Sequence, residues 1–353
     1  MAHELSTRAN GFVEMAYVGA AGWHGLGNEL PLGASIEEWQ VASGMDFRVL
    51  RSKVRYFTSA DGAEQLTWDD NHVLFRSDNK LPLGLVSPSY KVVQPALVLE
   101  FFRDLVANSG YTLNTAGTLF GGKKMWALAK VEQQDVQRGD AVGGYLLLST
   151  SADGSMATEA RETTVRVVCN NTLSMAQGAG SHGAIKVSHR SRFDDAKLKK
   201  QMGESLSHFH AFMDQARSLS TKPVTNAAAE AFVRELLRPA KETAQMAQAV
   251  ANLGGSDFAS LLGVPARLSE AVSIVDEKRA PRGEADILTL FRSNALGGNM
   301  LGAQGTAWGL VNAVTEYVDH KKTAKSADHR LDSALFGDGD ALKSRAFELA
   351  RTL

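Results

Sequence analysis

The chain has 353 residues, of which 44% are hydrophobic and 22% charged, and these are the proportions of a folded globular protein. No stretch approaches the run of about 18 apolar residues that crosses a membrane, and the first residues lack the apolar core of a secretory signal, so we expect a cytoplasmic protein without a membrane contact. The net charge of −1 excludes coating of DNA by bulk charge, and the single cysteine, Cys169, excludes an internal disulfide.

The first predicted helix begins after Ser35. Ser35 and Glu38 have the spacing of a capping box, and Gly44 is suited to end the helix. The segment 47–57 is rich in β-branched, aromatic and basic residues, and it is followed by a turn and further short apolar runs up to Val86. This pattern predicts antiparallel strands whose basic side chains lie on the exposed face.

A second helix is expected from Pro95 to Gly110, because proline suits the first turn of a helix and glycine suits its end. An apolar stripe along this segment supports the assignment. Two hairpins, a β-branched strand and a short helix are predicted next. The first hairpin pairs residues 111–119 with 123–131, and the second pairs 144–150 with 155–161. The strand is expected at residues 163–169 and the short helix at 173–177.

From about Ala196 the pattern changes to helical spacing. Helices are expected near residues 226–237, 284–292, 306–323 and 340–349. The fold class is therefore α+β, with antiparallel hairpins packed on a long helix and a helical C-terminal region. We expect three parts: an N-terminal segment with a short helix, the α+β core and the helical region, at residues 1–45, 46–195 and 196–353.

A basic stretch after the last predicted strand is the most suggestive feature. Lys186, Ser188, Arg190 and Arg192 share one side of an extended segment, where the three cations can follow successive phosphates. An edge strand whose charges discourage aggregation explains the same pattern equally well. The candidate nucleic-acid-binding residues are Lys186, His189, Arg190, Arg192, Lys197, Lys199, Arg166, Arg161, Arg51 and Lys53. Trp23, Trp126 or Tyr90 would stack bases beside them.

Motifs for nucleotide chemistry are missing or misplaced. Residues 178–183 have the G-x-G-x-x-G spacing, but a predicted helix precedes them and a strand-like run follows, which is the reverse of a dinucleotide-binding loop. No phosphate-binding G-x-x-x-x-G-K-[ST] loop occurs. Cys169 shares a strand face with valines, which favours a buried thiol over a nucleophile. We therefore expect no cofactor and no catalytic residue.

Five segments together resemble the phage/plasmid-like protein family, a domain-of-unknown-function family of phages, prophages and conjugative plasmids. They are GWHGLG at 22–27, LGLVSPSYKVVQ at 83–94, RVVCNNTL at 166–173, HR at 189–190 and GTAWGLVNAVTEYVDH at 305–320. The resemblance implies a mobile genetic element and brings no known activity. The order of hairpins around one helix is also similar to the core of phage single-strand annealing proteins, which form rings, hold single strands in a basic groove and need no nucleotide.

The resulting hypothesis is a mobile-element protein that binds single-stranded DNA, with strand annealing in recombination that needs no ATP. Few charges per chain are available, so we expect a homo-oligomer that places several protomers along one strand. One alternative is a metal-dependent nuclease or hydrolase that uses Glu316, Asp319 and His320 together with a loop histidine, His182 or His189. Glu316 and His320 are four residues apart on a predicted helix. Another is a host-directed protein that counters defence by binding a protein partner.

Overall fold

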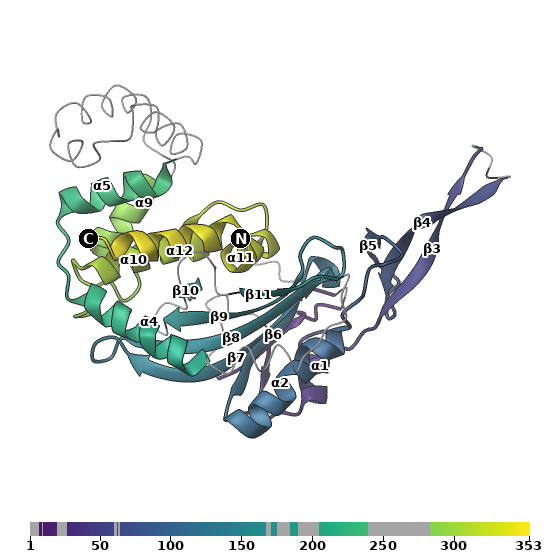
Figure 1. Ribbon diagram of the computed structural model, residues 1–353, viewed down its shortest axis with the longest axis horizontal. Helices are drawn as coiled ribbons and strands as arrows, with labels where there is room; N and C mark the ends of the chain where they lie inside the picture. The colour runs from purple at the N-terminus through teal and green to yellow at the C-terminus, as the bar shows by residue number, and fades with distance from the viewer. Residues whose placement is uncertain are drawn as a thin grey trace, which may run out of the picture.

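The computed structural model describes residues 7–8, 10–19, 27–59, 62, 64–166, 171–174, 184–189, 205–238 and 283–353. It contains helices and two sheets, which confirms the mixed α+β class. A large eight-stranded sheet forms the centre of the molecule, and a three-stranded sheet extends from one end of it (Figure 1). None of the helices in these ranges has the length and apolar character of a membrane span.

The N-terminal part packs on one edge of the large sheet. Strand β1 (Met15–Val18) pairs in parallel with β2 (Asn28–Leu30) and antiparallel with β6. Helix α1 (Ile36–Ala42) follows, and its predicted capping box is confirmed: the Glu38 amide donates to the Ser35 hydroxyl at 3.2 Å, and the Ser35 amide donates to the Glu38 carboxylate at 2.7 Å. Gly44 has a φ of 72°, which suits the turn after the helix.

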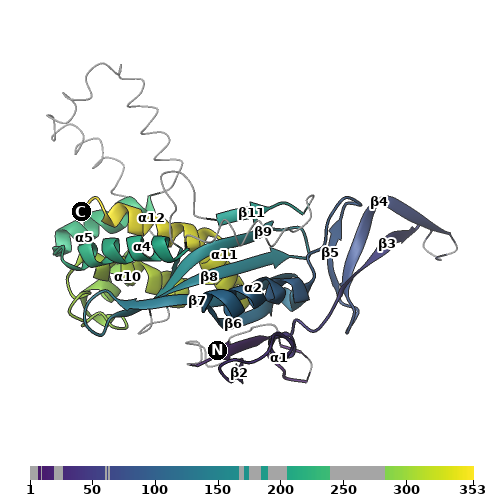
Figure 2. The ribbon, with the colours of Figure 1, turned by 60° about the horizontal axis from the view of Figure 1, so that its bottom comes forward.

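The small sheet is a long ribbon. Strands β3 (Val49–Phe57) and β4 (Gln65–Arg76) pair antiparallel, and the shorter β5 (Pro82–Val86) pairs with β4 only near the base of the ribbon. Both views show β3 and β4 at the opposite end of the molecule from helix α5 (Asn226–Leu237) (Figures 1 and 2). The predicted antiparallel strands between residues 47 and 86 are confirmed.

The large sheet has the order β10-β9-β8-β7-β6-β1-β2, and β11 also pairs with β9. Helix α2 (Pro95–Ser109) directly precedes β6 in the chain and contacts β6, β7 and β8. The strands after α2 are β6 (Thr112–Leu119), β7 (Lys124–Asp135), β8 (Ala141–Ser151), β9 (Thr158–Arg166), β10 (Asn171–Ser174) and β11 (Ala184–Val187).

Two faces of this sheet are covered by different helices. On one face, Ala127, Leu146 and Leu148 belong to the apolar cluster that includes Phe101 and Phe102 of α2. The opposite face carries a smaller cluster of Trp126 and Leu147, against which side chains of α11 pack. Alternation of side chains along each strand therefore places the core on both sides.

The described residues of the C-terminal region, 205–238 and 283–353, are mainly helical, as predicted. Its elements are α4 (Ser205–Ser220), α5 (Asn226–Leu237), α9 (Glu284–Thr289), α10 (Ala307–Glu316), α11 (Ala327–Phe336) and α12 (Asp338–Ala350), with π-helical turns at Leu290–Asn294 and Tyr317–Lys321. The bounds of α5 agree with the predicted range 226–237. Helices α4, α5 and α10 share one apolar cluster with Val142 of β8 and with Val136, which follows the end of β7. The three-part division of the chain stays a prediction.

Two local predictions are wrong. The short helix expected from residue 173 is contradicted at its start, because Asn171–Ser174 is strand β10. The reason is the ladder with β9, which the hydroxyls of Thr163 and Thr164 reinforce by donating to the Leu173 carbonyl, each at 3.1 Å. The segments 155–161 and 163–169 were expected as two strands, whereas Thr158–Arg166 is one continuous strand.

Candidate nucleic-acid interface

The β3–β4 ribbon has two chemically different faces. Arg51, Lys53, Arg55 and Phe57 alternate along β3, and side chains two residues apart on a strand lie on the same face. All four are exposed, and Phe57 has 63% of its surface accessible. Their cross-strand partners are Leu74, His72, Thr67 and Gln65. We call Arg51, Lys53, Arg55 and Phe57 the basic face.

The opposite side of the same ribbon is apolar. Val54 pairs with Trp68, and Tyr56 pairs with Leu66. Tyr56, Leu66 and Trp68 keep 46%, 43% and 44% of their surface exposed. These side chains therefore form an exposed apolar patch on this side of the ribbon. We call Val54, Tyr56, Leu66 and Trp68 the apolar face.

The cations of the basic face differ in how tightly they are held. The Arg51 guanidinium donates to the carbonyls of Pro88 and Tyr90, at 3.2 and 2.5 Å. Lys53 lies 3.5 Å from Asp69, and both side chains are largely exposed. Arg55 donates to Gln65 at 3.4 Å. Exposed contacts of this kind exchange readily with water or a phosphate, so Lys53 and Arg55 are available to an anionic ligand.

The base of the ribbon joins the region of His189. The Tyr90 carbonyl accepts a hydrogen bond from the Arg51 guanidinium. The Tyr90 ring stacks on the His189 ring, with 4.5 Å between the ring centroids and 17° between the ring planes. The Tyr90 hydroxyl donates to the Ser151 carbonyl at 2.8 Å, and burial raises the pKa of Tyr90 to about 12. The structure thus brings Arg51 and His189, two predicted site residues, to either side of one tyrosine.

His189 is buried, so its role here is to hold two segments together. Its ring nitrogens face the carbonyls of Lys91 and Met156, at 3.0 and 3.1 Å. The Lys91 amide donates in return to the His189 carbonyl at 2.5 Å. Lys186, on β11, has an exposed side chain 3.6 Å from Glu159. The chain leaves this junction toward residues 190–200, which carry much of the predicted basic stretch.

Arg161 and Arg166 lie elsewhere and are buried. The Arg161 guanidinium donates to Asp340 at the start of α12, at 2.6 Å. Arg166 makes two bonds to the Asp140 carboxylate, at 2.6 and 2.9 Å. Both charges are therefore compensated inside the protein, where they connect β9 to other parts of the chain. Their predicted role in nucleic-acid binding stays a prediction, but both guanidinium groups are buried and paired with carboxylates.

Several predicted residues fall outside the described ranges. They are Arg190, Arg192, Lys197, Lys199, Trp23, Cys169 and the glycine-rich residues 178–183. Of the other stacking candidates, Trp126 is 4% exposed and Tyr90 is half-buried against His189. The exposed aromatic side chains of the ribbon were not singled out from the sequence. Only the alternation of Arg51, Lys53 and Arg55 signalled this surface.

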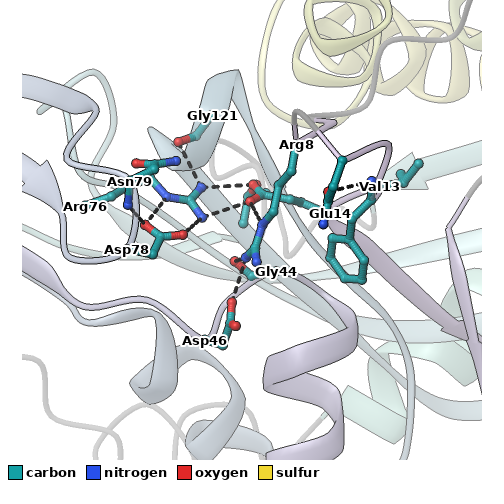
Figure 3. A network of polar contacts seen from close by, with 12 residues as sticks. Arg8, Val13, Glu14, Gly44, Asp46, Arg76, Asp78, Asn79 and Gly121 are labelled. Carbon is teal, nitrogen blue, oxygen red and sulfur yellow. Dashed lines mark hydrogen bonds and ion pairs between the residues drawn. The ribbon is translucent and has the colours of Figure 1, made fainter.

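A buried ionic network connects the ribbon to the large sheet (Figure 3). The Arg76 guanidinium, 1% exposed, makes bonds to Glu14 at 2.8 and 3.0 Å and to Asp78 at 2.8 and 3.0 Å. Thr118 donates to Glu14 at 2.5 Å, and Arg8 donates to it at 2.7 Å. The hydrogen bonds from Arg76 lower the pKa of Asp78 to about 2. The network therefore fixes the base of the ribbon against β1 and β6.

The residues of the alternative metal site make separate contacts. Glu316 accepts from the Leu296 amide at 2.8 Å, and its burial raises the pKa of this carboxyl. Asp319 forms a buried ion pair with Lys343 at 2.7 Å. Within the ranges that the structure describes, no group of three or more His, Cys, Asp or Glu side chains is arranged to hold a metal ion. These carboxylates act as structural anchors of the C-terminal helices.

A family model described as "Domain of unknown function (DUF932)" matches residues 82–335, which is most of the chain. The chain belongs to the DUF932 family. The DUF932 match includes the junction of Tyr90 and His189 and all but the end of the helical region, whereas strands β3 and β4 precede it. No curated protein and no solved structure matches the chain significantly. The family description names no phage or plasmid, so the mobile-element context stays a prediction.

Proposed function

We propose that this DUF932 protein binds single-stranded DNA on the basic face of the β3–β4 ribbon and does no covalent chemistry on it. The observation that carries the proposal is the row of Arg51, Lys53 and Arg55 on one exposed strand face, continued by exposed Phe57. Cations at regular spacing follow a phosphate backbone, and a free aromatic ring stacks on a base of any sequence. This combination favours single strands, whose bases are accessible, over duplex.

The position of the ribbon supports the same function. The ribbon extends from the body, so a strand of DNA reaches its basic face without passing between other elements (Figure 1). At its base lies the junction of Tyr90 and His189, from which the chain continues into the basic residues 190–200. Binding without nucleotide hydrolysis, in a phage or plasmid setting, would support the annealing of complementary strands during recombination.

The first test measures the salt dependence of binding. In the double variant Lys53→Ala/Arg55→Ala, affinity for labelled single-stranded DNA should fall, and the logarithmic salt slope should flatten by about 1.4, since each lost phosphate contact contributes about 0.7. Fluorescence anisotropy at several salt concentrations gives both quantities. The control Lys321→Ala/Lys325→Ala removes the same charge from exposed positions outside the ribbon. Equal slopes for the two double variants would contradict the proposal.

A second variant separates stacking from charge. Phe57→Ala should weaken binding by about 1–3 kcal/mol, the usual contribution of one stacked base, without changing the salt slope. If affinity for single strands stays at the wild-type value, Phe57 has no part in the interface. A protein partner remains the second candidate, because the apolar face of the ribbon is also exposed.

A further inference from the structure

The outer half of the ribbon is incomplete as a folded unit. Strand β5 pairs with β4 only from His72 to Phe75, so residues 54–57 and 65–68 pair only with each other among the described strands. Both faces of this part are exposed to solvent. A two-stranded hairpin alone is marginally stable in water, and a third strand or a packed face is normally needed. The outer ribbon by itself is therefore expected to be only marginally stable.

Both edges of the outer ribbon are open. No strand in the described ranges pairs with the outer side of β3, or with the outer side of β4 over residues 65–71. Unpaired amides and carbonyls along such edges are a template for another strand. A partner that adds a strand would complete the ladder and cover part of the apolar face.

The two edges carry opposite charge. Strand β3 has Arg51, Lys53 and Arg55 and no acidic residue. The outer part of β4 has Asp69 and Asp70, which lie at the register shift of the β3–β4 ladder, and it has no Lys or Arg before Arg76. Within one ribbon, the exposed side chains of Lys53 and Asp69 lie 3.5 Å apart as an ion pair, although the ladder partner of Lys53 is His72. Opposite charges across neighbouring strands stabilise a sheet, and like charges destabilise it.

We infer that the ribbon pairs edge to edge with the ribbon of a second copy of this chain, β3 of one copy beside outer β4 of the next. Pairing of β3 with β3 would place basic residues opposite each other, whereas β3 beside β4 places Lys53 and Arg55 near Asp69 and Asp70. Such a head-to-tail contact repeats from copy to copy and produces a ring or a filament.

This assembly deepens the proposed function, although its formation requires no DNA. Successive ribbons place their basic faces side by side, which extends the DNA-binding surface from copy to copy. Only that role rests on the proposed function. If the protein assembles but does not bind DNA, this inference holds and the proposed function is wrong. If the protein binds DNA as a monomer, the proposed function holds and this inference is wrong.

Charge exchange between the two edges tests the inference. One variant, Lys53→Glu/Arg55→Glu, has two acidic edges, and the other, Asp69→Lys/Asp70→Lys, has two basic edges. Each alone should associate at least about tenfold more weakly than wild type, because like charges now meet at every contact. An equimolar mixture should recover association, since acidic β3 then meets basic β4. Sedimentation velocity without DNA measures the species in each sample.

Three results would overturn the inference. They are a wild-type protein that stays monomeric at high concentration, a mixture that fails to recover, and an Asp69→Lys/Asp70→Lys variant that associates like wild type. The last result would indicate β3–β3 pairing, because that variant leaves β3 unchanged. The control Lys321→Glu/Lys325→Glu makes the same change in charge as the first variant at exposed positions outside the ribbon, and it should associate like wild type.

Discussion

At the scale of single residues, burial decides what a charge does. Arg76 and Arg103 each bond two carboxylates, but Arg76 is 1% exposed and the side chain of Arg103 is 47% exposed. A buried carboxylate that loses its partner keeps its cost of desolvation, whereas an exposed one is solvated by water. The two arginines form the same kind of contact with very different consequences for the free energy of unfolding.

Arg76→Leu should lower the free energy of unfolding by about 3 kcal/mol or more, because it leaves the Glu14 carboxylate buried with fewer partners. The matched control Arg103→Leu should cost less than about 1 kcal/mol. Urea denaturation followed by circular dichroism gives both values. Similar costs for the two variants would show that the network of Figure 3 contributes no more than a surface contact.

At the scale of elements, close contact between a helix and the sheet depends on glycine. A Cβ atom at Gly144 of β8 would lie 2.5 Å from the Phe209 ring of α4, which is fully buried. The strand therefore needs glycine at this point for α4 to lie on the same sheet face as α2. This contact helps to position the helical region on the sheet.

Gly144→Ala should destabilise the protein by about 1–3 kcal/mol, as overpacking of a core does. Phe209→Leu removes part of the ring that the new methyl group would meet, so the double variant should be more stable than the sum of the single effects predicts. A double-mutant cycle from thermal or urea unfolding measures this coupling. Strictly additive effects would mean that α4 shifts freely and that the contact is not tight.

At the scale of the whole molecule, the outer ribbon and the body are separable. The three apolar clusters include none of the side chains of residues 51–57 or 64–73. The ribbon also extends away from the rest of the chain (Figures 1 and 2). Stability is therefore held by the body, and the ribbon is available for binding.

A shortened chain should keep its fold and lose the proposed DNA binding. Lys53 and His72 are cross-strand partners, so replacing residues 54–71 with Asn-Gly closes the ribbon with a two-residue hairpin turn. The melting temperature should change by less than about 4 °C, whereas single-strand affinity should fall strongly. A large loss of melting temperature would show that the outer ribbon contributes to the core.

The sequence by itself determined the features that depend on neighbours along the chain. The capping box of Ser35 and Glu38, the helix at residues 226–237 and the strand character of residues 47–57 were all predicted, because caps and periodicity act over a few residues. The alternation of Arg51 and Lys53 on an exposed face followed from the same local rule.

Only the tertiary structure decided which charges are free. In the sequence, Arg161 and Arg166 resemble Arg51, because all three are basic residues of predicted strands. In the structure, Arg161 pairs with Asp340, 179 residues away, and Arg166 pairs with Asp140, 26 residues away, so both charges are neutralised inside the protein. Glu14 likewise meets Arg76 across 62 residues. The exposure of Phe57 and Trp68 also depends on what the fold leaves uncovered. Burial and ion pairing depend on segments that are distant in the sequence and pack together in the fold. Local periodicity describes only neighbouring residues, so it cannot predict these partners.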